Sequence, residues 1–485
     1  TTDTFHAGTY VNGTDFALID FDGAGTGVRA PVYGTDAGFV NATTALTAAA
    51  NNNVTADFTE VGALAIKSLR IDGSSTNTLT LGGTLTIQDN GAGSNDGGIL
   101  LTGGSATITG GGLTTGGTGD LYFRVEGGAN TLTVSSTVTT SSDGSFVKSG
   151  AGTLIVNSTF NNIGINAINE GTVQLGASGN LANRNTYVGG NAILDLNGKS
   201  ESFRGLENSG QIINSSGTAL TLSIGTGNGG GVNSGIIDET SGQISITKIG
   251  TADLSLDGLN TYTGSTTIGS TGSIIVSNLA NIGFASGIGK GDSTSDATNA
   301  ASLVFTGASA GGDYSALYYD GWNAVATDRL FTFGGTGADS GVHIRADGVN
   351  QSSLVFSNTG ALAFGVGTDD VNQTLRLGGN TVADNVFNPQ ITDNPNSSSP
   401  GTLGVTSVLI KPNANSNSVI WTLGNTNNTY TGTTTIGTGG DINDFARLVA
   451  IDGQGLSTAS GLQINNGMLL SSGTFTRDLV ATLTP

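Results

Sequence analysis

The chain has 485 residues, of which 80 are glycine, 6 are proline and none is cysteine, so disulfides are excluded. Its 36 acidic and 16 basic residues give a net charge of −20, and the lysines and arginines form no basic run, which disfavours nucleic acid as a partner. No apolar run reaches the roughly 18 residues of a membrane-spanning helix, so we expect no membrane-spanning segment.

Residues 1–60 have the least regular pattern, and we expect them to form an irregular or capping region at the N-terminus. Asp20 and Asp22 with Gly23 resemble half of a calcium loop. The further spaced acceptors and the closing glutamate are absent, so an ordinary Asp-Gly turn is the favoured interpretation. Residues 40–53 have modest helix propensity and suit a cap or a surface loop.

From residue 61 onward, short runs alternate apolar and polar residues and end at glycines. Leu79 with Leu81 and Leu132 with Val134 are examples of such alternating pairs. This period of two indicates strands with one buried face. Strands of three to five residues with frequent breaks also occur in sandwiches and barrels.

The clearest unit lies at residues 248–276, where three short strands are separated by glycine corners. One corner carries Tyr262 in the run Asn-Thr-Tyr-Thr-Gly. Four apolar side chains of the unit are expected to point inward: Leu254, Leu256, Ile268 and Ile274.

This unit recurs along the chain. Residues 421–437 repeat it with Tyr430 in place of Tyr262, and residues 148–175 hold a weaker copy with Phe160 at that position. Repetition of strand–glycine–strand units is typical of a solenoid. With only six prolines, the repeats favour an all-β fold, a right-handed parallel β-helix (β-solenoid) over residues 61–485 that forms a single elongated rod.

Two spans interrupt the strand pattern and are expected as lateral loops. Residues 279–325 begin with a loop rich in glycine, serine and aspartate. Residues 388–400 contain three of the six prolines.

The 248–276 unit resembles the autotransporter-associated β-helix repeat, also called the passenger-associated transport repeat. The residues that carry the resemblance are Lys248, Gly250, Leu254, Leu256, Gly258, Asn260, Tyr262, Gly264, Thr267, Ile268 and Gly272. The resemblance covers most of residues 60–479. It implies a secreted parallel β-helix that is displayed at, or released from, the bacterial cell surface.

The acidic residues give little sign of catalysis. Many of them directly precede a glycine, which is typical of turns, among them Asp72, Glu126, Asp143, Glu170, Asp257, Asp347 and Asp452. The two histidines, His6 and His343, lie far apart in the sequence. We therefore expect no catalytic residues, no metal site and no cofactor.

Four aromatic residues cluster within nine positions: Tyr314, Tyr318, Tyr319 and Trp322. Aromatic faces stack on sugars, so this group is the candidate patch for glycan binding or adhesion. The alternative, which we favour, is that these rings cover an apolar side of the coil.

Three functions remain open, and we rank them. The first is a non-enzymatic extracellular structural element, a cell-surface layer, stalk or filament that forms by self-association of the chain through end strands. The second is an adhesin that binds surface glycans or other cells through its flank. The third is a polysaccharide-degrading enzyme. We also expect the chain to be one segment of a longer protein.

Overall fold

The structure is a computed structural model. It divides into two compact units, Thr1–Leu220 with Thr240–Gly242, and Thr221–Glu239 with Gln243–Pro485. The residues that it describes are 5–20, 27–73, 77–88, 95–140, 143–269, 272–307, 314–337, 340–395, 404–412, 418–437 and 445–473, without the side chains of residues 5–7, 19 and 20.

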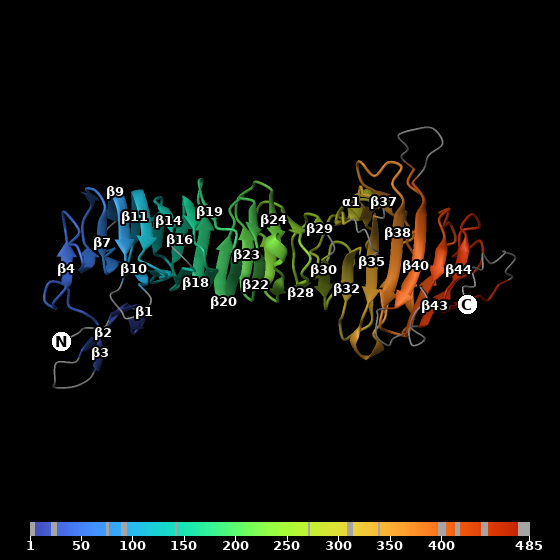
Figure 1. The fold of residues 1–485 in the computed structure, drawn as a ribbon, viewed down its shortest axis with the longest axis horizontal. Coiled ribbons are helices and arrows are strands. Elements are labelled where there is room, and N and C mark those ends of the chain that lie inside the picture. The colour runs from blue at the N-terminus through green and yellow to red at the C-terminus, as the bar shows by residue number, and fades with distance from the viewer. Residues whose placement is uncertain are drawn as a thin grey trace. The chain divides into compact units, whose positions relative to one another are not determined.

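The first unit is a parallel coil with three sheet faces, and each turn of the chain adds a strand to a face (Figure 1). The first face contains β4 (Phe39–Ala42), β5 (Asn51–Val54), β8 (Ser68–Ile71), β10 (Gly97–Leu101), β12 (Leu121–Val125), β15 (Phe146–Ser149), the first parts of β18 (Asn166–Leu175) and β20 (Asn185–Asp195), and β22 (Gly205–Asn208).

The other two faces of this unit share several long strands that bend at a corner. The second face contains β6 (Phe58–Glu60), the first parts of β9 (Asn77–Ile87) and β11 (Ser105–Thr115), β13 (Thr131–Val134), β16 (Thr153–Val156), the second parts of β18 and β20, and β23 (Gln211–Asn214). The third contains β7 (Leu64–Ile66), the second parts of β9 and β11, β14 (Thr137–Thr139), β17 (Thr159–Asn161) and β19 (Asn180–Leu181).

A small antiparallel sheet of β1 (Phe5–Val11), β2 (Asp15–Asp20) and β3 (Gly27–Arg29) packs on the flank of this coil. Phe16 and Leu18 cover the outward-facing Leu100, which is therefore fully buried. The guanidinium of Arg124 lies 4.6 Å from the ring centre of Tyr10. Within the predicted N-terminal region 1–60, the described sheet thus covers a side of the coil.

The parallel ladder begins at Phe39, earlier than the predicted residue 61. Its second strand, β5, is Asn51–Val54, and all four of its residues are buried. The asparagines are satisfied by neighbours, as where Ser68 Oγ donates to Asn51 Oδ1 at 2.8 Å. By register Asn52 and Val54 point inward, while Asn51 and Asn53 share the outward row of Leu100. Because three of the four residues are asparagine, the strand lacks the apolar alternation by which a sequence reveals it.

The second unit has the same organisation, again with three faces. The first contains β25 (Gly231–Asn233), β28 (Leu254–Leu256), β30 (Ser273–Val276), β32 (Ser315–Tyr319), β35 (Ser340–Ala346), β38 (Gln373–Gly379), β40 (Thr406–Pro412), β42 (Thr434–Ile436) and β44 (Leu462–Ile464). The second contains β27 (Ile244–Lys248), β29 (Thr266–Ile268), β31 (Leu303–Phe305), β34 (Thr332–Phe333) and β37 (Ala363–Phe364).

The third face of the second unit contains β33 (Val325–Thr327), β36 (Leu354–Phe356), β39 (Asn385–Phe387), β41 (Ser418–Leu423), β43 (Phe445–Val449) and β45 (Gly467–Leu470). The remaining described elements are β21 (Glu201–Phe203), β24 (Leu220–Ile224), β26 (Ile236–Glu239), the short 3₁₀ turns η1 (Thr226–Asn228) and η2 (Val349–Gln351), and the helix α1 (Asp296–Ala301). Among the described residues, no helix is both long and apolar enough to cross a membrane.

The predicted parallel β-helix is confirmed, and so is its inward face. Leu254, Leu256, Ile268 and Ile274 are all fully buried. Leu254 is in register with Ile274 on the next turn, so like side chains stack along the core. Each such side chain contributes about 1.5–3 kcal/mol by leaving water.

The span 279–325, predicted as a lateral loop, holds regular structure where it is described. It includes α1, β31, β32 and the start of β33. Ile274 is in register with Leu317, so this turn of the coil takes 43 residues. The helix depends on a reciprocal cap, in which Thr298 N donates to Ser295 Oγ at 3.2 Å and Ser295 N donates to Thr298 Oγ1 at 2.9 Å. Elements of three to six residues are too short for sequence periodicity to reveal.

The second predicted loop, residues 388–400, is described only as far as residue 395. There Asn394 is fully buried and donates from Nδ2 to Thr368 O at 2.7 Å. Residues 396–400 lie outside the described part of the chain.

Candidate functional site

The repeated motif forms a corner of the coil, which we call the corner motif: residues 260–264 and 428–432. Its tyrosine points inward, and both Tyr262 and Tyr430 are fully buried. The hydroxyl of Tyr262 lies 2.7 Å from Thr266 Oγ1, and that of Tyr430 lies 2.8 Å from Thr434 Oγ1. The two copies thus make the same bond to the threonine four residues later.

The asparagine that opens each corner motif bonds to the preceding and the following turn of the coil. Asn260 Oδ1 accepts from Ile237 N at 2.9 Å, and its Nδ2 donates to Gly287 O at 2.8 Å. Asn428 makes the corresponding bonds, accepting from Ile391 N and donating to Gly455 O, both at 2.8 Å.

The threonine after the tyrosine binds a carboxylate of the preceding turn. Thr263 donates from N and Oγ1 to the two oxygens of Glu239 at 2.7 and 2.8 Å. Thr431 donates from N to Asp393 Oδ1 at 3.1 Å and from Oγ1 to Asp393 Oδ2 at 2.6 Å. The polar groups of the corner motif are therefore used to join turns of the coil, which is a structural role.

The lysine of the repeat also has a structural role. Lys148 is fully buried, and its ammonium donates to the carbonyl oxygens of Ser149, Gly150 and Glu170 at 2.6–3.0 Å. Lys248 is buried in the same way and donates to Ile249 O at 2.6 Å and Gly250 O at 3.1 Å. Burial lowers the pKa of Lys148 to about 7 and that of Lys248 to about 8.

The four candidate aromatic residues do not share one surface. Two lie on opposite faces of β32, one precedes this strand and one follows it. Tyr319 points into the coil and is buried, and its hydroxyl donates to Asn323 O. Tyr318 is partly exposed on the outer face, and Tyr314, also partly exposed, lies against Gly341 of the next strand. Trp322 follows the strand and is 69% exposed. Alternation along β32 puts Tyr318 outside and Tyr319 inside. Together with the flanking Tyr314 and Trp322, three of the four rings are at least partly exposed.

The structure brings together basic residues that the sequence leaves scattered. His343, Arg345, Arg376 and Lys411 lie on the outer rows of β35, β38 and β40, and we call them the basic cluster. His343 is in register with Arg376, while Arg345 and Lys411 flank Gly378. The absence of a basic run in the sequence does not reveal this group, because members on different strands are at least 31 residues apart in the chain.

Tyr318 belongs to the same surface as the basic cluster. The guanidinium of Arg345 lies 4.3 Å from the centre of the Tyr318 ring, a distance typical of a cation–π contact. The ring of His343 meets that of Tyr318 edge to face, with centres 5.7 Å apart. The described surface therefore combines cations with an aromatic ring.

The acidic residues before glycines lie at the corners of the coil where the structure describes them. Asp257 and Asp347 directly follow β28 and β35, and Asp143 has a φ of 59°, as in a turn. Asp347 pairs with Arg345, and burial raises the pKa of Asp347 to about 6. Among the described residues, no three His, Cys, Asp or Glu side chains form a group that could hold a metal ion. The half calcium loop at Asp20 and Asp22 lies outside the described side chains.

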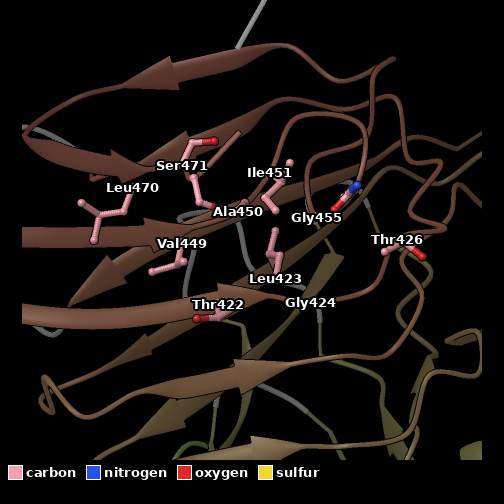
Figure 2. A pocket seen from close by; sticks show the side chains of 12 residues that line it. Thr422, Leu423, Gly424, Thr426, Val449, Ala450, Ile451, Gly455, Leu470 and Ser471 are labelled. Carbon is pink, nitrogen blue, oxygen red and sulfur yellow. The ribbon is translucent and has the colours of Figure 1, made fainter. Parts of the chain in front are cut away.

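A cavity of about 440 Å³ lies beside the ends of β41, β43 and β45. Figure 2 shows side chains that line it. Leu423, Ala450, Ile451 and Leu470 supply much of its apolar wall, and hydroxyls come from residues such as Thr426. None of the described residues that line it is ionisable, so they supply no acid or base for catalysis.

Comparison with known proteins finds one informative similarity. The chain is 31% identical over 287 residues to the adhesin BmaC autotransporter of Brucella suis biovar 1 (strain 1330). The match covers 58% of this chain and 8% of that protein. No protein-family model matches the chain, so membership in the repeat family stays a prediction. No solved structure matches it.

Proposed function

We propose that this chain is part of a non-enzymatic adhesin of the autotransporter type, displayed at the bacterial surface. The observation that supports this most is the similarity to an autotransporter adhesin over more than half of the chain. The fold fits the role. The polar groups of the corner motifs are bonded within the coil, so the side chains on the outer faces of the strands are the ones that can contact a partner.

The surface that we assign to adhesion is the outer face of β32, β35, β38 and β40. It carries Tyr318 and the basic cluster, whereas the corner motifs are occupied by bonds within the coil. Surface glycans are the partner class that we propose, because partly exposed aromatic rings beside polar groups suit sugar rings. Trp322, which is exposed after β32, extends the candidate patch.

The test is adhesion of beads coated with the purified chain to cultured cells and to glycan-coated surfaces. We expect the folded chain to retain beads, and the same chain unfolded by heat and coated at equal density to lose this retention. Equal retention by folded and unfolded protein would show that no specific surface is involved.

Self-association into a layer or filament, the function that the sequence ranks first, stays a prediction. The net charge of −20 opposes close packing of copies, so association should strengthen when salt or calcium screens it. Light scattering at rising protein concentration, with and without calcium, measures this. A mass that stays that of the monomer under all conditions would contradict self-association and leave the adhesin proposal standing.

We also propose that the chain has no polysaccharide-degrading activity. Incubation with acidic polysaccharides should release no reducing ends and no unsaturated products. Turnover that is lost when a pair of carboxylates is replaced would contradict this proposal.

A further inference from the structure

The basic cluster concentrates positive charge in a chain whose overall charge is strongly negative. Only 16 of the 485 residues are lysine or arginine, yet three of them share the outer face of β35, β38 and β40. The carboxylate of Asp347 pairs with Arg345, which neutralises part of this charge. Neighbouring strands are about 4.8 Å apart, so the cations repel one another at close range.

His343 lies at the centre of this cluster and is 4% exposed. Its Nε2 has no hydrogen-bond partner among the described residues. A Cβ on Gly378 would lie 2.5 Å from Nε2, so the glycine at this position leaves the space that the imidazole fills.

The charged and titratable groups around His343 come from four strands. They are Tyr318 of β32, Arg345 of its own strand β35, Arg376 of β38 and Lys411 of β40, and Asp347 reaches the group through Arg345. Burial and then the three cations hold the pKa of His343 well below its ordinary value, so the ring is neutral at pH 7. An anion bound among the cations would offset their field and let the imidazole take up a proton.

We propose that the basic cluster binds the carboxylate or sulfate groups of an acidic polysaccharide, and that His343 gains a proton when the anion binds. The anion site stands on the geometry of the cluster, whereas the choice of a polysaccharide rests on the proposed adhesin function. Tyr318 supplies an aromatic edge beside the cations, which suits a sugar that carries an acidic group. Duplex DNA is also a polyanion, so it is the competing polymer that the experiment must separate from an acidic polysaccharide.

The experiment measures binding of the full chain to four polymers at about 50 mM salt, where screening is weak. The probes are dextran sulfate, polygalacturonate, neutral dextran and duplex DNA. We expect dextran sulfate, polygalacturonate or both to bind, which identifies the anionic group, and neutral dextran to bind far less. Binding of neither acidic polymer, or tighter binding of DNA than of both, would overturn the proposal.

Variants show whether the binding uses the cluster. Lys411→Gln and Arg376→Gln should each weaken binding roughly fivefold by removing one cation. Arg447→Gln is the matched control, because Arg447 lies on β43 beside Phe445 and also carries one charge. If Arg376→Gln fails to fold, Lys411→Gln still decides, since Lys411 is partly exposed. An equal loss in Arg447→Gln would show attraction by charge alone and would overturn the site.

The pH dependence tests the role of His343. Dextran sulfate keeps its charge across the range, so a change between pH 7 and pH 5 reports on the protein. The chain should bind more tightly at pH 5, and His343→Gln should lose the part of this gain that comes from the imidazole while still binding at pH 7. Asp347, which pairs with Arg345 and has a pKa of about 6, supplies the remaining gain in both proteins as its carboxylate takes up a proton. Identical pH profiles would remove His343 from the proposal.

The two proposals fail separately. Loss of polymer binding with retained bead adhesion would overturn the anion site and leave the adhesin function. Polymer binding that depends on Lys411 without any bead adhesion would leave the site and overturn the function.

Discussion

Tyr262 and Tyr430 show how one residue joins local and long-range structure. Each is fully buried, and each hydroxyl meets the threonine four residues later at 2.7–2.8 Å. A buried hydroxyl needs a partner, because leaving it unpaired costs about 1–3 kcal/mol. The tyrosine thus fills the core while its polar end is satisfied at the corner. Phe160 fills the equivalent position in the weaker copy with a ring alone, packed on Phe123 and Phe146.

Tyr262→Phe and Tyr430→Phe should each lower the free energy of unfolding by about 1 kcal/mol, because each removes one buried hydrogen bond and leaves the packing intact. Urea denaturation followed by circular dichroism measures this. Tyr187→Phe is the control, since Tyr187 is 38% exposed and should change stability little. The same loss in all three variants would mean that the hydroxyl bond has no special role.

Glu201 predicts a pH dependence of stability. It is 4% exposed, accepts from Leu181 N at 3.3 Å, and has its pKa raised to about 7, mainly by burial. Between about pH 4.5 and 7 the folded chain holds a proton that the unfolded chain has released, so this residue makes stability fall as pH rises through that window. The total effect is at most about 3 kcal/mol.

Glu201→Gln should remove this dependence and should stabilise the chain relative to the original at pH 8 more than at pH 5. Glutamine keeps an acceptor for Leu181 N and carries no charge. Denaturation at the two pH values measures the difference. Glu207→Gln, at an exposed position of β22, is the matched control and should leave the pH profile unchanged. A profile for Glu201→Gln that runs parallel to the original would contradict the argument.

At the scale of the element, the corner is defined by close approach of backbones. Gly264 and Gly432 each end a corner motif directly against the previous turn of the coil. A Cβ on Gly264 would lie 2.1 Å from Ile244 O, and one on Gly432 would lie 2.3 Å from Thr406 O. Gly432 N also donates to Thr406 O at 3.1 Å, so the corner cannot move away without losing a bond between turns.

Gly264→Ala and Gly432→Ala should each cost about 2–3 kcal/mol, because the added methyl group overlaps a backbone oxygen that cannot yield. The control is Gly461→Ala, whose new Cβ would lie 3.4 Å from the side chain of Thr433, an ordinary contact. Thermal and urea denaturation measure all three variants. A cost for Gly461→Ala as large as for the other two would show that lost glycine flexibility, and not the close approach, sets the effect.

At the scale of the whole molecule, each turn of a coil contacts its neighbours in the stack and little else. In such a structure, stability is a sum of local terms, and damage to one turn stays near that turn. The pairings within each unit follow this pattern: β9 pairs with β11, and β28 with β30.

Leu256→Asp should cost about 3–5 kcal/mol, because it places an unpaired charge in the core. Hydrogen exchange should rise in β28 and β30 and stay unchanged in β9 and β11 of the other unit. Asp257→Asn should cost little, since asparagine keeps an acceptor for Ser255 Oγ, which now lies 2.8 Å from Asp257 Oδ2. Exchange that rises equally in both units would show global, and not local, unfolding.

Much of the fold could be predicted from sequence, because its signals are local. Alternation of Leu254 and Leu256 with polar residues identifies a strand and its inward face without knowledge of the partner strand. Recurrence of the corner run identifies the solenoid. Local patterns do not reveal β5, whose buried asparagines look polar, or α1, which is too short to show a period.

The candidate site was only partly predictable. Alternation by itself places Tyr318 and Tyr319 on opposite faces, so the cluster of four aromatic residues could not all serve one surface. The corner motif could be recognised from its residue sequence. Its bonds to Glu239 and Asp393 could not be predicted, since they depend on which residues of the preceding turn lie beside it.

The sequence by itself therefore determined the strands, the inward residues and the coil, since each follows from spacing along the chain. The tertiary structure alone decided which outward residues meet. His343, Arg376 and Lys411 become neighbours because turns of 33 residues bring successive strands into register. Register depends on the length of every loop between strands. Loop lengths follow no period in the sequence, so the pairing of outward residues could not be predicted from it.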